Sequence, residues 1–409
     1  ETGSIIIADN YEITSTGTEE QEWQVEVIFV NLDSDQNANT NKTFNANLII
    51  REDSPIGITE VSTSNITSDS ITLTVEAESE NEITNYYFAK NEEEYVSSAS
   101  NTYTFSGLDA GTEYTLKAYA VDSEGYQSAV YSTETTTADR TFASYIINNV
   151  YTGIDGENGL YYHDGTGSYT NANLEAGDNS YRYAGANPNN YVCFGSDAET
   201  CPADNLYRII GVFGNKVKLI RANSIGTYSW SGDGSINNNN WNESLLNTKI
   251  LNESYLNTLE SKWQNLIAES TWQVGGNTYQ NIQEVSARNA YQNELVSPAM
   301  NTTYNAKVGL MYVSDYGYAA SPENWNLTLY EYDSDTTINN NWMFMGANEW
   351  TISRRSDVTD FAYYVYFEGN DESHFVSLDV CSVRPSFYLE SSVILTGGSG
   401  TETDPFRIA

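Results

Sequence analysis

Positively charged residues are scarce in this sequence. Its 409 residues include 18 Lys and Arg against 56 Asp and Glu, so the formal net charge at neutral pH is -38. Nucleic acids and anionic membranes attract basic surfaces, and a surface this acidic repels them. We therefore expect neither nucleic acid nor an anionic membrane as a partner.

Long apolar runs and the short motifs of common enzymes are also missing. Without a stretch of 18 or more apolar residues, no membrane insertion is expected. GxSxG, HExxH, P-loop and GxGxxG patterns do not occur, and carboxylates are so numerous that a pair of them says little about catalysis. The sequence therefore predicts a protein that is not an enzyme.

Only three cysteines and two histidines are present. Cys193 and Cys201 enclose the short loop CFGSDAETC, and in an oxidising setting they are candidates for a disulfide, with Cys381 left over. Three free, buried thiols are the alternative interpretation. Because no CxxC and no Cys/His pair at metal spacing occurs, a zinc site is not expected.

The first 53 residues alternate apolar and polar side chains in two segments, WQVEVIFVNL and TFNANLII. Alternation of this kind places Trp23, Val25 and Val27 on one face and predicts half-buried strands. Residues 1–53 are therefore expected to form a β-sandwich-like module.

A polar stretch, NLDSDQNANTNKT, lies between these two segments. Its Asp33, Asp35 and Asn37 stand at alternate positions, the spacing with which a calcium loop begins. Ala38 occupies the position where such a loop needs glycine, and the glutamate that should close the loop is absent. We therefore favour a solvated loop over a calcium site, and expect no other cofactor.

From Pro55 onward, short alternating strands are separated by turn residues, as in a β-sandwich. The segment YTFSGLDAGTEYTLKAYAVDSEGYQS resembles the second half of a fibronectin type III module. Leu108 and Tyr114 stand at that family's Leu and corner-Tyr positions, where the Tyr hydroxyl bonds back to the chain. The resemblance covers residues 54–138. The loop DSEGYQS carries no Arg-Gly-Asp. The resemblance therefore implies that the module is a spacer rather than a receptor-binding module.

The remaining residues, 139–409, mix helical and strand patterns. TFASYIINNVY predicts a short helix, LYRIIGVFGNKVKLIRANSIG predicts two strands joined by a tight turn, and apolar residues at three- and four-residue steps over 241–267 predict two helices. Further short strands follow. This pattern predicts an α+β domain.

Several segments of this region resemble known proteins. NEWTIS and VRPSFYL resemble positions in the last strands of the C-type-lectin-like fold. Residues 141–409 also resemble a family of Gram-positive surface proteins. The segments that carry this second resemblance are NYVCFGSDAETCPADNLYRIIGVFGNKVKLI and SVRPSFYLESSVILTGGSGTETDPFRI. The resemblance implies that residues 139–409 form a C-type-lectin-like head, which presents loops to a partner. The expected chain is thus multi-domain, with two β-sandwich modules followed by this α+β head.

Candidate contact residues gather in the last hairpin, where aromatic and charged side chains alternate. Large aromatic surfaces suit recognition, although alternation places half of these rings in the core. The stretch EGNDE lacks the flanking motifs of calcium-dependent lectins, so a solvated turn is favoured there. For the paired arginines, we favour a structural bond to a carboxylate for one and partner contact for the other. The candidates are Arg354, Arg355, Tyr363, Tyr364, Tyr366, Glu368, Asn370, Asp371 and His374.

These features and resemblances favour an adhesin or host-factor-binding protein of a bacterial cell surface. Its β-sandwich modules would form a stalk, and its head would bind a host glycoprotein, an immunoglobulin, a mucin-type glycoprotein or a glycan. The expected location is extracellular, either secreted or anchored by a segment outside this sequence. The alternative is a structural, pilin-like or wall-matrix subunit without a specific host ligand.

Overall fold

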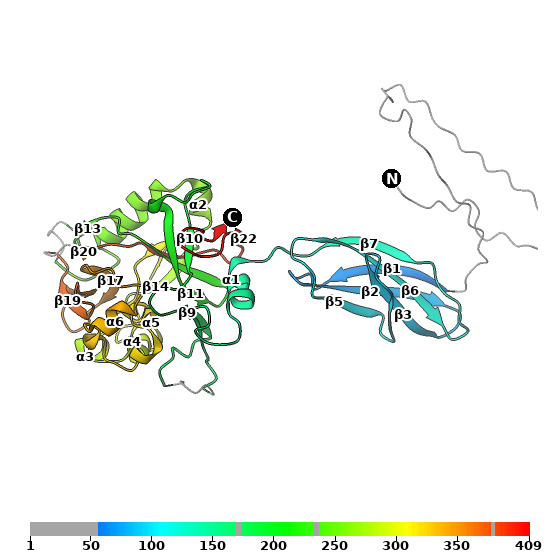
Figure 1. Ribbon diagram of the computed structural model, residues 1–409, viewed down its shortest axis with the longest axis horizontal. Helices are drawn as coiled ribbons and strands as arrows, with labels where there is room; N and C mark the ends of the chain where they lie inside the picture. The colour runs from blue at the N-terminus through cyan, green and yellow to red at the C-terminus, as the bar shows by residue number, and fades with distance from the viewer. Residues whose placement is uncertain (1–55, 168–172, 233–236, 378–380) are drawn as a thin grey trace, which may run out of the picture. The chain divides into compact units, whose positions relative to one another are not determined.

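The computed structural model describes residues 56–167, 173–232, 237–377 and 381–409 of the chain (Figure 1). The chain divides into two compact units, Glu1–Ala138 and Asp139–Ala409. The β-sandwich predicted for residues 1–53 lies outside the described residues, and so do its weak calcium candidates Asp33, Asp35 and Asn37.

Two antiparallel sheets form the described part of the first unit, with the strand orders β1-β2-β5 and β4-β3-β6-β7. The sequence of β6, EYTLKAYAVD, alternates strictly, so that Leu116, Ala118 and Ala120 face the core while their neighbours are half-exposed. The strands are β1 (Ile56–Ser64), β2 (Ser70–Ser79), β3 (Ile83–Lys90), β4 (Val96–Ser98), β5 (Thr102–Ser106), β6 (Glu113–Asp122) and β7 (Tyr131–Thr136).

The crossover from β5 to β6 is held by the predicted corner tyrosine. Leu108 and Tyr114 are both buried, and the backbone N–H of Asp109 donates to the Tyr114 hydroxyl oxygen over 2.8 Å. This bond ties the start of β6 to the chain five residues upstream, as in the tyrosine corner of β-sandwiches. The structure thus confirms the role predicted for Tyr114.

A seven-stranded sheet forms the centre of the second unit, in the order β16-β21-β12-β11-β9-β8 with β10 also paired to β11. The hairpin of β11 and β12 is the predicted core hairpin, and both of its strands are buried on two faces. The strands are β8 (Leu160–His163), β9 (Ser180–Tyr183), β10 (Tyr191–Cys193), β11 (Leu206–Phe213), β12 (Lys216–Arg221), β16 (Val308–Gly309) and β21 (Ser386–Tyr388).

A second sheet of five strands has the order β13-β20-β17-β18-β19, which leaves β19 at one edge. Its strands are β13 (Thr227–Tyr228), β17 (Glu349–Arg354), β18 (Phe361–Val365), β19 (Asp371–Phe375) and β20 (Cys381–Ser382). Two hairpins complete the strands: β14 (Ser270–Gln273) with β15 (Thr303–Ala306), and β22 (Leu395–Gly397) with β23 (Arg407–Ile408).

The helices of the second unit are short. The predicted helix after Arg140 is confirmed as α1 (Phe142–Tyr145) continued by η2 (Ile146–Val150), whereas residues 241–267 hold three consecutive pieces instead of two regular helices. These pieces are η4 (Leu246–Tyr255), η5 (Leu256–Thr258) and α2 (Ser261–Asn265). The others are η3 (Ala203–Asn205), α3 (Tyr279–Ile282), α4 (Ala287–Tyr291), η6 (Gln292–Val296), α5 (Val313–Ala319), η7 (Pro322–Asn324), η8 (Leu329–Glu331) and α6 (Asp335–Asn339). Among the described residues, no helix has the length and apolarity that crossing a membrane would require.

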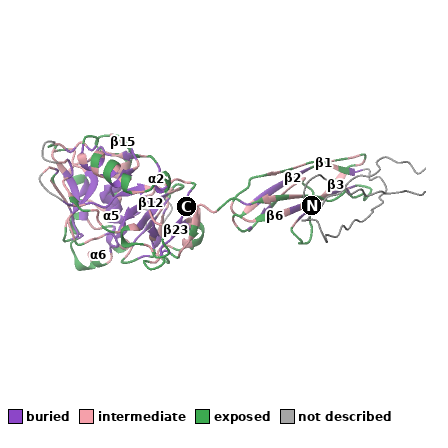
Figure 2. Cartoon of the chain, turned by 90° about the horizontal axis from the view of Figure 1, so that it is seen from above, coloured by how far each residue is buried: buried purple, intermediate pink, exposed green. Residues whose placement is uncertain are grey.

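Buried residues follow the sheets of each unit (Figure 2). In the second unit one apolar cluster surrounds β11, β12 and α5, and another is rich in tryptophan, with Trp230, Trp241, Trp272 and Trp350 inside it. Large aromatic side chains bury much apolar area each, which suits a domain with short strands and long loops. The chain is therefore multi-domain and built mostly on β-sheets.

Five of the 18 cations are buried in the second unit, although the surface is so acidic. Lys218 of β12 lies 2.5 Å from a carboxylate oxygen of Asp315 in α5, and the Arg182 guanidinium lies 3.5 Å from the other oxygen. In a separate pair, Arg384 donates two hydrogen bonds to Glu349. These pairs hold helix and sheets in register because a buried charge that loses its partner is costly. The five buried cations are Arg182, Arg208, Lys218, Arg221 and Arg384.

Replacing Tyr114 by Phe should destabilise only the first unit, because the Asp109 N–H loses its acceptor while the ring remains. The expected loss is about 1–2 kcal/mol of unfolding free energy. Scanning calorimetry of the full chain measures it as a lower melting temperature for one of two transitions. Tyr126→Phe, at an exposed ring, is the control and should change neither transition. Equal effects of the two variants would contradict the corner role.

Lys218→Met should destabilise the second unit by about 3–5 kcal/mol, the usual cost of breaking a buried ion pair by removing one partner. Urea unfolding monitored by tryptophan fluorescence measures this loss. Lys249→Met removes the same charge from a pair with Glu253 in which the Lys side chain is 61% exposed, and should change stability by less than about 1 kcal/mol. A Lys218 variant as stable as this control would show that the buried pair contributes nothing.

Candidate functional site

The hairpin of β18 and β19 contains most of the contact residues predicted from the sequence. Phe361 pairs with Phe375 and Tyr363 with Ser373 across its two strands. The turn at Phe367–Asn370 closes on Gly369, whose φ of 106° and close approach to the Tyr332 carbonyl exclude a side chain. The hairpin therefore has one fixed register, which decides which of its side chains reach the surface.

Four of the predicted contact residues are buried. Contrary to the prediction, their side chains are not available to a partner. The Tyr363 hydroxyl donates to the Asn277 carbonyl, and the Tyr364 hydroxyl donates to a Glu372 carboxylate oxygen. Both neighbouring strands and the segments packed on them cover these rings. The four buried residues are Tyr363, Tyr364, Asn370 and Asp371.

Asp371 is the least expected of these, since the sequence placed it in a solvated turn. It is fully buried, and neither carboxylate oxygen has a hydrogen-bond partner among the described residues. Burial, and then the nearby carboxylates of Glu294 and Glu372, raise the pKa of Asp371 well above its usual range. The neutral, protonated form is therefore favoured at this position.

Several rings of the hairpin, the buried Tyr364 among them, form a continuous series, which we call the aromatic row. Ring centroids of neighbouring members lie 4.3–6.4 Å apart along the whole series. Phe375 at one end is 36% exposed and Phe367 at the other is 47% exposed, while Glu368 beside Phe367 is exposed as well. In order along the row, the members are Phe375, Phe361, His374, Tyr364, Tyr366 and Phe367.

The paired arginines go to different partners. Arg355 donates two hydrogen bonds to Asp357, which raises the pKa of Arg355, and its guanidinium lies 5.5 Å from the centroid of Phe361 in the aromatic row. Arg354 instead donates to the Val274 carbonyl and to the Asn239 side chain, and burial lowers its pKa. Arg355 is thus the one bonded to a carboxylate and also the one beside the half-buried ring of Phe361 in the aromatic row, two roles that the sequence had divided between the two residues.

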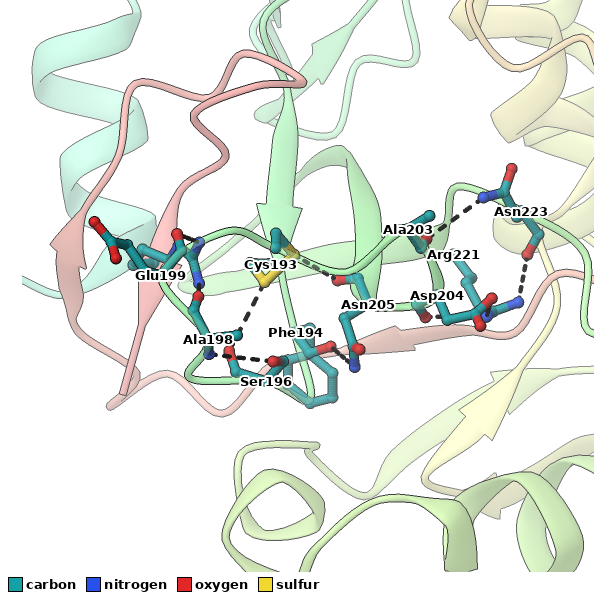
Figure 3. The surroundings of a disulfide bond; sticks show 12 residues. Cys193, Phe194, Ser196, Ala198, Glu199, Ala203, Asp204, Asn205, Arg221 and Asn223 are labelled. Atoms are coloured by element: carbon teal, nitrogen blue, oxygen red, sulfur yellow. Dashed lines mark hydrogen bonds and ion pairs between the residues drawn. A yellow bond between two sulfur atoms is a disulfide. The ribbon is translucent and has the colours of Figure 1, made fainter.

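The predicted disulfide is present in a different part of the same unit. Cys193, at the end of β10, is bonded to Cys201, and the Cα atoms lie 5.8 Å apart (Figure 3). The alternative of three free thiols is therefore wrong, and Cys381 is buried and lies outside this disulfide. We call residues 194–200, which the disulfide closes, the disulfide loop.

Bonds from distant segments hold the disulfide loop. Arg407 of β23 donates from its two terminal nitrogens to the carbonyls of Ala198 and Glu199, at 2.8 and 2.7 Å. Lys262 of α2 forms an ion pair with Asp197 and lies 5.2 Å from the Trp263 ring centroid. The loop is thus tied to α2, through a pair of residues 65 positions apart, and to the last strand, β23.

A cleft of about 330 Å³ lies between the disulfide loop, α2 and the hairpin of β22 and β23. No sequence pattern indicated this cleft, because its walls come from three segments with no shared local pattern. Only the short spacing of the two cysteines pointed to a constrained loop. The lining residues are Cys193, Ser196, Asp197, Ala198, Glu199, Trp263, Thr396, Arg407 and Ile408.

Within the described ranges, no three His, Cys, Asp or Glu side chains are grouped so that they could hold a metal ion. Glu368, Asn370 and Asp371, the weak calcium candidates of the turn, point to different surroundings: Glu368 is exposed, Asn370 donates to Glu372, and Asp371 is enclosed. The described part of the hairpin therefore offers no converging set of oxygen ligands.

The family model for the fibronectin type III domain matches residues 55–137. With its two sheets and its tyrosine corner, this segment is a fibronectin type III domain, as the sequence analysis predicted. The match ends before the second unit begins. No curated protein matches the chain.

Several solved structures are similar to parts of the chain. Domains A168–A170 of titin are 26% identical, with a TM-score of 0.18, and the match covers 21% of this chain and 32% of that one. The fn3 domain of the human collagen alpha-1(XX) chain is 21% identical, with a TM-score of 0.18 and coverages of 20% and 83%. Chitinase ChiA74 from Bacillus thuringiensis is 14% identical, with a TM-score of 0.20 and coverages of 45% and 20%. These low TM-scores support no inference about the second unit.

Replacing both Cys193 and Cys201 by Ser should lower the stability of the second unit, because the unfolded chain regains the freedom of the closed loop. For a loop of this length the expected loss is roughly 2–3 kcal/mol. Urea unfolding of the oxidised protein and of the double variant measures the difference. Cys381→Ser, at the buried cysteine outside the disulfide, is the control for loss of a buried sulfur. A reducing agent should destabilise the natural protein but not the double variant, and equal sensitivity of both would contradict the expectation.

Proposed function

We propose that the chain is an extracellular binding protein of a bacterial cell surface, an adhesin or host-factor-binding protein, in which a fibronectin type III stalk carries a C-type-lectin-like head that recognises a host glycoprotein, such as an immunoglobulin or a mucin. The fibronectin type III domain fits a stalk or a binding role. The head corresponds to residues 139–409. Recognition, and not catalysis, is the activity that we propose for it.

The observation that carries this proposal is the aromatic row on the edge hairpin of the second unit. Exposed apolar rings are costly to leave in water, and aromatic residues with an adjacent arginine are the side chains that dominate binding energy at protein interfaces. Phe367 and Phe375 provide the exposed rings, and Arg355 provides the cation beside Phe361. An edge strand also leaves backbone groups of β19 available for a partner.

Two further observations support the location. The disulfide of Cys193 and Cys201 is of a kind that persists in oxidising surroundings outside the cytosol. The net charge of -38 keeps such a chain soluble and repels acidic surfaces, so a partner would be neutral or basic where it touches the protein. Both features suit a protein exposed at a cell surface.

The double variant Phe367→Ser, Phe375→Ser should lose partner binding by at least about tenfold without loss of stability, because exposed rings at an interface contribute about 1–2 kcal/mol each to binding and little to folding. Immobilised full-length protein is incubated with human serum and with mucin, and the retained component is identified and titrated against the variant. Calorimetry confirms that the variant remains folded.

The matched control is Ile154→Ser, Val296→Ser, which removes two apolar side chains that are more exposed than the two rings, from a loop before β8 and from η6. It should bind as the natural protein does. Retention of no serum or mucin component, or equal binding by both double variants, would contradict the proposal. Concentration-dependent fibres in the absence of any ligand would favour instead a structural, pilin-like or wall-matrix subunit.

A further inference from the structure

Asp371, the first residue of β19, carries a buried carboxyl group without compensation. Its side chain is excluded from water, and neither of its carboxylate oxygens has a hydrogen-bond partner among the described residues. By contrast, the buried Glu294 accepts three hydrogen bonds, and the buried Glu349 is paired with Arg384. Burying a charge without a hydrogen bond or a cation is costly, so the ionised form is disfavoured at Asp371 on its geometry.

The ionisable groups that act on Asp371 are carboxylates and phenols. Glu294 in η6 and the adjacent Glu372 in β19 are carboxylates, and after burial both raise the pKa of Asp371 further above its usual range. Tyr363 in β18 and Tyr316 in α5 donate their hydroxyls to backbone carbonyls, and the charge of Asp371 contributes to the raised pKa of each phenol. The strongest charges near Asp371 therefore repel a second negative charge.

The arginines around the same sheet are bonded to other groups. Arg355 donates to Asp357 and reaches the Ser373 hydroxyl at 3.4 Å, while Arg354 donates to the Val274 carbonyl. Arg384, as noted, is bonded to a glutamate. In the described part of the chain, no cation is thus paired with Asp371.

Gln283, which follows α3, shows that the interior around Asp371 lacks a donor. Its amide nitrogen donates to the Asp371 carbonyl at 2.5 Å, while its own side-chain oxygen is buried without a partner. Two residues in contact therefore hold three unpartnered acceptor atoms. An ionised carboxyl group is an acceptor only, whereas a protonated one is also a donor, so a proton on Asp371 relieves this arrangement.

The position of Asp371 couples it to the aromatic row. Asp371 pairs with Val365 across the hairpin, directly after the turn that Tyr366 closes by donating its N–H to the Asn370 carbonyl. The two exposed rings of the row, Phe367 and Phe375, stand four residues before and four residues after Asp371. A movement of Asp371 toward water would therefore disturb the turn and the strand that present these rings.

We propose that Asp371 is a proton-operated switch for the aromatic row: the protonated acid holds the hairpin of β18 and β19 closed, and loss of the proton loosens the hairpin and weakens partner binding. The negative charge then faces Glu294 and Glu372, and Asp371 is drawn toward water. The effect on binding rests on the proposed function, whereas the loosening of the hairpin concerns this chain alone.

The direction of the pH effect follows from the protons that each state binds. An aspartate in the unfolded chain has a pKa of about 3.9, and the pKa of Asp371 in the folded protein is well above it. Between these two values the folded state holds a proton that the unfolded state has lost. The stability that this group contributes is therefore fully present below about pH 4 and is lost as the pH rises through this window.

Asp371→Asn keeps the shape of the side chain and is neutral at every pH. Urea unfolding of the full-length protein and of this variant is measured from about pH 4 to about pH 9, and the two unfolding constants of the second unit are compared at each pH. Their ratio should change by up to about tenfold per pH unit, with the natural protein becoming the less stable one. Glu368→Gln, at an exposed carboxylate of the same turn, is the control and should give a nearly constant ratio. A constant ratio for Asp371→Asn as well would overturn the proposal.

Hydrogen exchange of peptides from residues 361–376, measured by mass spectrometry, tests the loosening directly. The natural protein and Asp371→Asn are compared at the same pH, so that the intrinsic exchange rates cancel. Exchange should be equal at about pH 5 and roughly threefold or more faster in the natural protein at about pH 8 to 9. Peptides from the fibronectin type III domain should exchange equally in both proteins. Equal exchange of the hairpin over the whole range would overturn the switch.

The binding experiment separates this proposal from the proposed function. The serum or mucin component retained by the natural protein should bind it more weakly at about pH 8 than at about pH 5, and Asp371→Asn should bind that component equally at both. Equal pH dependence in both proteins would overturn the control of binding by Asp371. If no component is retained, the proposed function fails, and the exchange of the hairpin still decides whether Asp371 is a switch.

Discussion

The arrangement of the second unit depends on the ion pairs of the Asp315 carboxylate. Asp315 lies in the first turn of α5. Its carboxylate accepts a hydrogen bond from the ammonium of Lys218 in β12 and lies beside the guanidinium of Arg182 in β9. All three side chains are almost wholly excluded from water, so each would be strongly destabilising without the others. The helix therefore has one position on the seven-stranded sheet.

A second carboxylate links the same helix to the other sheet. Glu294 of η6 accepts hydrogen bonds from the backbone N–H groups of Val313 and Ser314 and from the hydroxyl of Ser353 in β17. Because β17 is the neighbour of β18, the start of α5 also fixes the sheet that carries the aromatic row. The position of Phe375 at the surface thus depends on charged contacts in the interior.

The distribution of charge explains how one chain combines a very acidic surface with a stable interior. The acidic excess lies mainly where water screens it, while cations such as Lys218 and Arg384 are placed inside against single carboxylates.

Local patterns in the sequence determined the parts of this protein whose physics is local. Short alternating strands predicted a β-sandwich, and the resemblance of the segment with Leu108 and Tyr114 identified it as a fibronectin type III domain. The eight-residue separation of Cys193 and Cys201 suggested the disulfide. Only the tertiary structure decided which side chains at similar local positions are buried and which are exposed. Tyr364 is enclosed and Phe367 is exposed because other segments cover one and not the other, and Asp371 is buried although its turn is polar. The cleft likewise exists only because α2 and the last hairpin meet the disulfide loop, and no local pattern encodes a meeting of segments so far apart along the chain.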